Sequence, residues 1–186
     1  MSNKKVFSTL GASAHTQKER EKDDFYETPI EAVQALLSLE SFTGEIWECA
    51  CGKNRIANVL KENGHKVFSS DLIDRGVNAS IMNFLESNRK TNNIITNPPF
   101  KHSLQFVKKA LELADGKVAM LLRIQFLEGK ERYEFFKEFN PSKVYVFGNR
   151  VNTIIDDKPY NSAMCLCWFI WDKSYKGDTV IKWLMY

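Results

Sequence analysis

The stretch Ile46-Trp47-Glu48-Cys49-Ala50-Cys51-Gly52-Lys53-Asn54 begins as a short apolar run and ends in small residues and glycine. The apolar run predicts a strand over residues 46–50, and the residues that follow predict a helix over 56–62. A turn of small residues between them lets a ligand approach the backbone closely. A nucleotide-binding turn usually has glycine at the place that Asn54 occupies here. Asparagine tolerates left-handed geometry, so we expect the turn to be preserved. Taken alone, the segment also fits a plain strand-to-helix turn.

Strands and helices alternate along the rest of the chain. Further strands are predicted at residues 66–70, 93–96, 117–122, 144–147 and 163–171, with an edge strand at 179–184, and helices at 29–39, 103–114 and 130–139. The first of these helices is introduced by a capping-box pattern, Thr28-Pro29-Ile30-Glu31. This order predicts an α/β fold with a mostly parallel, seven-stranded sheet covered by helices on both faces.

Ligands of such sheets bind outside the carboxyl ends of the strands, and the chemically marked residues of this chain stand there. Asp71 ends the strand that follows the glycine turn. A carboxylate at this place accepts hydrogen bonds from both hydroxyls of a ribose. The simpler alternative is a turn or helix-capping aspartate.

Asn97-Pro98-Pro99-Phe100 directly follows the strand predicted at 93–96. Consecutive prolines fix the backbone, so the Asn97 amide oxygen and the Pro98 carbonyl can point at one spot. Two fixed acceptors can hold both hydrogens of a planar NH2 group and turn the nitrogen lone pair toward an incoming methyl group. Phe100 supplies a flat face on which a planar base can stack. We therefore predict that residues 97–100 form a reaction centre.

Composition narrows the remaining possibilities. A chain of 186 residues suits one ordinary domain, and its net charge of +3 does not by itself indicate a nucleic-acid binder. Local phosphate contacts are expected at Arg123, Lys130 and Arg150, with solvated surface charge as the alternative. No metal site is expected, because the cysteines form two Cys-x-Cys pairs (49/51 and 165/167) inside apolar runs, where buried reduced thiols are usual.

Several classes of protein are excluded by the sequence. The chain has no apolar run near the roughly 20 residues that cross a bilayer, and its first residues lack a secretory signal, so a cytoplasmic protein is expected. Neither a Gly-x-Ser-x-Gly nucleophile elbow nor a P-loop occurs. Residues 1–24 are polar and lack apolar periodicity, which predicts a flexible or partly ordered arm before a single domain over 25–186.

These residues together resemble the class I S-adenosylmethionine-dependent methyltransferases, specifically the DNA N6-adenine type with the Asn-Pro-Pro-Phe motif and its compact phage or prophage forms. The likeness extends over about residues 25–184. It implies a Rossmann-like methyltransferase domain whose sheet includes a reversed C-terminal strand, within residues 160–171. It also implies S-adenosylmethionine as cofactor and a nucleic acid, DNA rather than RNA, as partner.

The resemblance also assigns roles to single residues. It places cofactor contacts at these positions: Tyr26, Thr28, Pro29, Glu48, Ala50, Gly52, Asp71 and Asn83. Asn83 stands where the family often has an acid that contacts the cofactor's adenine amine, and Asn54 replaces a glycine. Alternatives that stay open are an RNA base or a protein glutamine as methyl acceptor, and a catalytically degenerate binding protein with the same fold.

Overall fold

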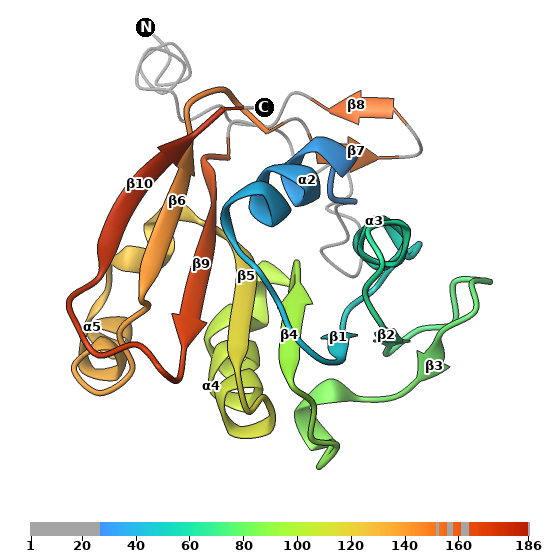
Figure 1. Ribbon diagram of the computed structural model, residues 1–186, viewed down its shortest axis with the longest axis horizontal. Helices are drawn as coiled ribbons and strands as arrows, with labels where there is room; N and C mark the ends of the chain where they lie inside the picture. Colours follow the sequence, from blue (N-terminus) through green and yellow to red (C-terminus); the bar gives the residue numbers. More distant parts are fainter. Residues whose placement is uncertain (1–26, 152, 156–157, 161–163, 186) are drawn as a thin grey trace, which may run out of the picture.

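The computed structural model describes residues 27–151, 153–155, 158–160 and 164–185. The strands of its main sheet are β1 (Ile46–Glu48), β2 (Val67–Asp71), β3 (Ser80–Ile81), β4 (Asn93–Thr96), β5 (Lys117–Arg123), β6 (Lys143–Phe147), β9 (Leu166–Asp172) and β10 (Val180–Leu184). They lie in the order β10-β6-β9-β5-β4-β1-β2-β3 (Figure 1). All neighbours are parallel except β9, which runs antiparallel to both β5 and β6.

The α/β class and the mostly parallel sheet are confirmed, but the predicted number of seven strands is wrong. The eighth strand is β3, which has only two residues, both of them exposed. Such a strand has no apolar alternation by which a sequence could reveal it. A reversed strand is present, as expected, but it is not the last one. β10 follows it and pairs in parallel with β6 at the edge of the sheet.

Helices cover both faces of the sheet, as predicted. The helical elements are α2 (Ile30–Leu39), α3 (Arg55–Glu62), α4 (Ser103–Leu113), α5 (Lys130–Phe136) and the short 3-10 turns η1 (Phe84–Glu86), η2 (Phe100–His102) and η3 (Ile124–Leu127). Apolar residues of α2 and α3 pack into one core cluster, and those of α4 and α5 pack into a second cluster on the other face. A separate hairpin of β7 (Thr153–Ile155) and β8 (Lys158–Tyr160) lies near the carboxyl ends of the parallel strands (Figure 1).

The start of α2 differs from the predicted capping box. Pro29 is the residue before the first helical position, and no side chain caps the helix there. The Thr28 hydroxyl instead accepts a hydrogen bond from the Asn97 side chain at 3.1 Å. The helix is held from its flank, because the Trp168 indole of β9 donates to the Ala32 carbonyl at 2.8 Å. This bond ties α2 to the sheet, but it caps no amide of the first helical turn.

The cysteines are all free thiols, and three of the four are buried as expected. The prediction is wrong for Cys165, which is exposed because it stands just before the first residue of β9 rather than within the strand. Among the described residues, no helix has the length and apolar character that crossing a bilayer requires.

Candidate active site

The sheet topology creates a crevice between β1 and β4. From β1 the chain adds β2 and β3 on one side, and then returns to add β4 and β5 on the other. A change of direction of this kind leaves a gap at the carboxyl ends of the two central strands, where α/β proteins bind ligands. A cavity of about 400 Å³ lies there, which is within the usual range for small-molecule sites.

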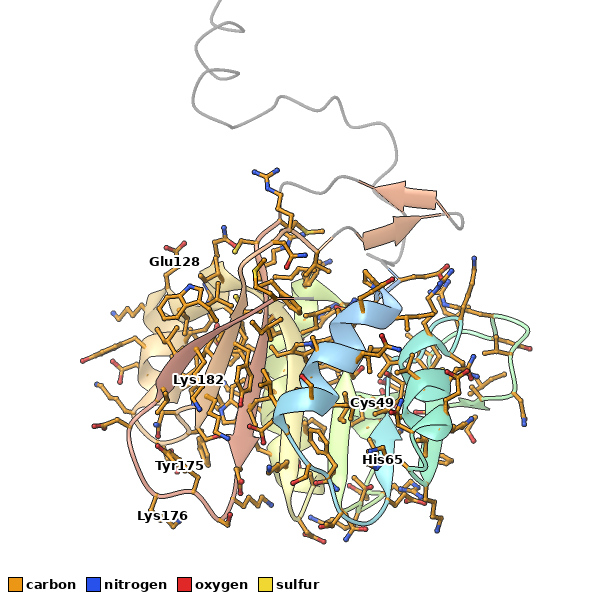
Figure 2. The ribbon with its side chains drawn as sticks, turned by 45° about the horizontal axis from the view of Figure 1, so that its top comes forward. Cys49, His65, Glu128, Tyr175, Lys176 and Lys182 are labelled. Carbon is orange, nitrogen blue, oxygen red and sulfur yellow. The ribbon has the colours of Figure 1, made fainter. Side chains whose placement is uncertain are left out.

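Polar groups of the cavity come from five chain segments, and its apolar walls come mainly from the turn after β1, the loop after β2, α3, η1 and α4. The lining residues include Glu27, Thr28, Ala50, Lys53, Arg55, Asp71, Asn83, Asn97, Pro99, Lys101 and His102. Several residues predicted at distant positions are therefore brought together around one space. Figure 2 shows Cys49, which also lines the cavity, in the interior of the molecule.

The glycine turn has the geometry expected from its sequence. Asn54 adopts a left-handed backbone with φ 64°, and it is the only non-glycine residue with positive φ among the described residues. The Gly52 amide donates to Asp71 Oδ2 at 2.8 Å, and the Ile73 amide donates to Asp71 Oδ1 at 3.0 Å. Asp71 is thus fixed between the turn and its own strand end, with its carboxylate at the cavity wall.

Glu48 lies beneath the cavity and is completely buried. Burial raises the pKa of this carboxyl group to about 8, although hydrogen bonds from the Thr96 hydroxyl and the Ala50 amide favour the charged form and the nearby Asp71 opposes it. Thr96 Oγ1 donates to Glu48 Oε1 at 2.6 Å, whereas Oε2 accepts no hydrogen bond of ordinary geometry among the described residues. The sequence predicted Glu48 as a cofactor contact. The structure places it next to the lining residues rather than among them.

Asn97 leaves the end of β4 and faces the cavity. Its Nδ2 group donates to Thr28 Oγ1 across 69 residues of sequence, which fixes the orientation of the amide. Pro99 lines the cavity beside it, and Pro98 is buried behind. The Asn97 amide oxygen is therefore held on a rigid strand end, as predicted, and the residue that holds it is one that sequence reasoning assigned to a helix cap.

Phe100 does not line the cavity. Its ring is half-buried against the core cluster on the α2 side of the sheet. The Arg123 guanidinium, at the end of β5, lies 4.3 Å from the ring centroid. The predicted stacking face is therefore covered by an arginine in this structure.

The sequence did not predict the ion pairs of a charged group at the rim. Glu27 is buried, and it forms ion pairs with Lys53 at 2.8 Å and with Arg55. All three line the cavity. Lys101 and His102, which follow Phe100, are exposed at the same rim. Their position directly after a strand-end motif is the only sequence signal that could have suggested them.

The other predicted residues lie at varied distances from the cavity. Asn83 lines it, and its Oδ1 accepts from the Leu85 amide at 3.2 Å, so part of its amide caps η1. Pro29 and Gly52 are buried beside the cavity.

The predicted phosphate contacts at Lys130 and Arg150 lie elsewhere. Lys130 lies in a separate groove with three glutamates of α5 and its C-terminal flank, and Arg150 is exposed in the loop after β6. Tyr26 and the predicted arm at 1–24 lie outside the described residues. No group of metal ligands occurs in the part of the chain that the structure describes.

Comparison with known proteins identifies this architecture. No protein-family model matches the sequence, and no protein of curated function matches it. Among solved structures, the "putative RNA methyltransferase" of Pyrococcus horikoshii aligns with a TM-score of 0.66 and 17% identity over 94% of this chain and 100% of its own. The M protein of the type I restriction enzyme EcoKI aligns with a TM-score of 0.60 and 15% identity over 100% of this chain, which spans 56% of that protein.

A third similar structure is the magnesium protoporphyrin IX methyltransferase of Synechocystis PCC 6803 with bound SAH. It aligns with a TM-score of 0.53 and 10% identity over 77% of this chain and 80% of its own. At such identities the likeness concerns the fold. The chain therefore has the Rossmann-like fold of the class I methyltransferases.

Proposed function

We propose that residues 25–186 form an S-adenosylmethionine-dependent methyltransferase domain that acts on an exocyclic amino nitrogen, N6 of adenine in DNA. The observation that carries the proposal is the position of Asn97. Its amide lies at the wall of the switch-point cavity, at the end of a rigid strand, and is oriented by Thr28. An amide held in this way suits recognition of an NH2 group beside a bound ligand.

The residues around the cavity fit S-adenosylmethionine. Asp71 presents a fixed carboxylate of the kind that binds ribose hydroxyls, and apolar side chains of η1 and α4 offer a wall for a purine ring. The charged group of Glu27, Lys53 and Arg55 provides both signs of charge for an amino-acid end. Glu48 Oε2 adds a buried polar group below the turn that has no hydrogen-bond partner of ordinary geometry among the described residues. When bound, the cofactor supplies an electrophilic methyl group.

The residues of this chain mainly hold and orient the substrate nitrogen. The Asn97 amide oxygen and the Pro98 carbonyl accept its two hydrogens, which directs the nitrogen lone pair into the cavity. The nitrogen would take the methyl group as the bond from that carbon to the cofactor's sulfur breaks, the electron pair would go to the sulfur, and one proton would leave the nitrogen to water. Because an amine inside a duplex cannot reach such a site, the base must be flipped out or single-stranded.

An RNA base is the second acceptor to consider, because one of the two most similar folds described above belongs to a protein named as an RNA methyltransferase. A protein glutamine amide also offers a planar NH2 group. A non-catalytic protein with this fold would differ from all of these, because it would show no heat of binding when titrated with the cofactor.

The proposal is tested by transfer of a tritiated methyl group from the cofactor to DNA, RNA and a glutamine-containing peptide. Wild type is expected to label adenine-containing DNA, and Asn97→Ala is expected to lose at least about a hundredfold in rate, in the range reported for removal of one group that positions the transition state. Lys176→Gln, an exposed change at the opposite end of the sheet, serves as the control. Equal labelling by wild type and Asn97→Ala would refute the role of Asn97.

A further inference from the structure

The contact between Arg123 and Phe100 lies directly beside the cavity. Phe100 follows the two prolines after β4, and Arg123 ends β5, the neighbouring strand. The guanidinium lies 4.3 Å from the centroid of the Phe100 ring, which is partly buried against the core cluster. The guanidinium thus lies over the ring, and the ring itself contacts the core.

The charge of Arg123 is not balanced by its surroundings. Its Nε–H group is buried and donates to no partner among the described residues, and none of their carboxylates forms an ion pair with this side chain. A half-buried guanidinium without a counter-ion is costly, and such groups usually have a partner. Guanidinium groups bind phosphates and stack on flat π systems, so the chemistry of the missing partner is that of a nucleotide.

We propose that Arg123 is a substrate-binding residue, and that a nucleobase stacks on the guanidinium layer above Phe100. This inference rests on the proposed function and specifies its substrate class. A nucleotide offers a flat ring for the stack and a phosphate for the charge, whereas a glutamine side chain offers neither. Phe100 then acts through Arg123, because its ring packs against the guanidinium.

A lysine variant of Arg123 separates the contribution of stacking from that of charge, because lysine keeps the charge of arginine and lacks its planar group. The experiment measures binding of two fluorescein-labelled single-stranded oligodeoxynucleotides by anisotropy. One contains a single adenine and the other has an abasic site at that position. Wild type, Arg123→Lys, Arg123→Gln and the control Lys176→Gln are compared, and the melting temperature of each variant verifies its fold.

Arg123→Lys is expected to weaken binding of the adenine probe about tenfold and to leave the abasic probe within about twofold, because base stacking is worth about 1–3 kcal/mol. Arg123→Gln should weaken both probes, and its log–log dependence of affinity on salt should lose about 0.7 in slope, the share of one phosphate on a single strand. Equal binding of the adenine probe by wild type and Arg123→Lys would overturn the proposal. An equal loss on both probes by a folded Arg123→Lys would also overturn it.

The binding experiment and the methyl-transfer experiment test the role of Arg123 and the proposed function separately. If wild type methylates adenine and Arg123→Lys binds the adenine probe normally, the role of Arg123 is wrong while the methyltransferase activity stands. If wild type transfers no methyl group but the two probes separate as expected, the activity is wrong while the nucleotide site stands.

Discussion

Single side chains at the cavity are oriented by partners that are far away in sequence. The amide of Asn97 has a donor end and an acceptor end, and only one of them should face a substrate NH2 group. Thr28 decides which, because its hydroxyl oxygen accepts from Nδ2 at 3.1 Å. Under the proposed function, the amide oxygen of Asn97 is the end that faces the substrate, and Thr28 is a positioning residue.

Replacing the Thr28 hydroxyl tests this assignment. Thr28→Val has nearly the same shape but lacks the acceptor, so the amide of Asn97 can rotate. We expect kcat to fall about tenfold, the equivalent of 1.4 kcal/mol, with little change in substrate KM. Thr28→Ser keeps the hydroxyl and is expected to restore most of kcat. Steady-state kinetics of the two variants check this, and a Ser variant as slow as the Val variant would contradict it.

The buried carboxyl group of Glu48 should give the free energy of unfolding an unusual dependence on pH. Its pKa is about 8 in the folded protein and close to 4.5 when the chain is unfolded. Between these two values the folded state binds the extra proton, so the contribution of Glu48 to stability is present below pH 4.5 and is lost as the pH rises to 8. The slope from this one group is at most about 1.4 kcal/mol per pH unit.

Glu48→Gln removes this titration and keeps the shape of the side chain. The free energy of unfolding of the variant, minus that of wild type, should therefore increase as the pH rises from 5 to 8. Denaturant titrations at several pH values measure this difference. A difference that stays constant over the range would show that Glu48 ionises normally.

The sequence predicted much of the candidate site but not how its residues interact. Asp71, Asn97 and the left-handed Asn54 were found because each stands at a strand end or turn with a local signature. The bond from Asn97 to Thr28 and the stack of Arg123 on Phe100 join residues from different strands and loops. Contacts of this kind depend on how the sheet is assembled, and no local pattern reports them.

Elements of secondary structure are tied together at the end of the sheet opposite the cavity. Glu40, directly after α2, is buried and accepts hydrogen bonds from Lys117 of β5 at 2.6 Å, from Lys143 of β6 at 2.5 Å and from the Tyr145 hydroxyl at 2.7 Å. Burial opposes ionisation of Glu40, but these three bonds outweigh it, so its pKa lies below the ordinary value. One carboxylate thus joins a helix to two strands.

Glu40→Gln should destabilise the fold by about 2 kcal/mol, because it leaves the partly buried Lys143 ammonium without its counter-charge and leaves Lys117 only the Asp172 carboxylate at 3.9 Å. The pKa of Glu40 is lowered, so its contribution is present above pH 4.5 and is lost as the pH falls through the folded value. Urea titrations at neutral and acidic pH therefore should show a difference between wild type and variant that shrinks in acid. Glu62→Gln, an exposed change on α3, is the control. A constant difference would contradict the ionic role of Glu40.

How well each helix or strand could be predicted from the sequence depended on its length and burial. The central strands and the four helices are confirmed within a few residues, because their apolar patterns are continuous or periodic. β3 was missed because it is two exposed residues, and the capping box was wrong because Thr28 bonds to a strand end instead. Tertiary packing decided the latter case over a local preference.

The molecule as a whole should respond to its cofactor through stability. A ligand that binds only the folded state at a hundred times its Kd stabilises it by about 2.7 kcal/mol, which for a chain of this size corresponds to a rise in Tm of about 5–10 °C. Asp71→Asn weakens a charge-assisted contact to ribose, and a tenfold loss of affinity would reduce the stabilisation to about 1.4 kcal/mol at the same concentration. Differential scanning calorimetry with S-adenosylmethionine checks both values. No rise in Tm for wild type would contradict cofactor binding at this cavity.

Chemical identification of the product tests the whole account most directly. Adenine-containing DNA is incubated with the protein and S-adenosylmethionine, digested to nucleosides and analysed by mass spectrometry against standards. The account predicts N6-methyldeoxyadenosine with wild type and a near-complete loss of it with Asn97→Ala. A methyl group on another nucleoside or on a ring nitrogen, or an undiminished yield from Asn97→Ala, would contradict the claim that Asn97 holds an exocyclic amine for methylation.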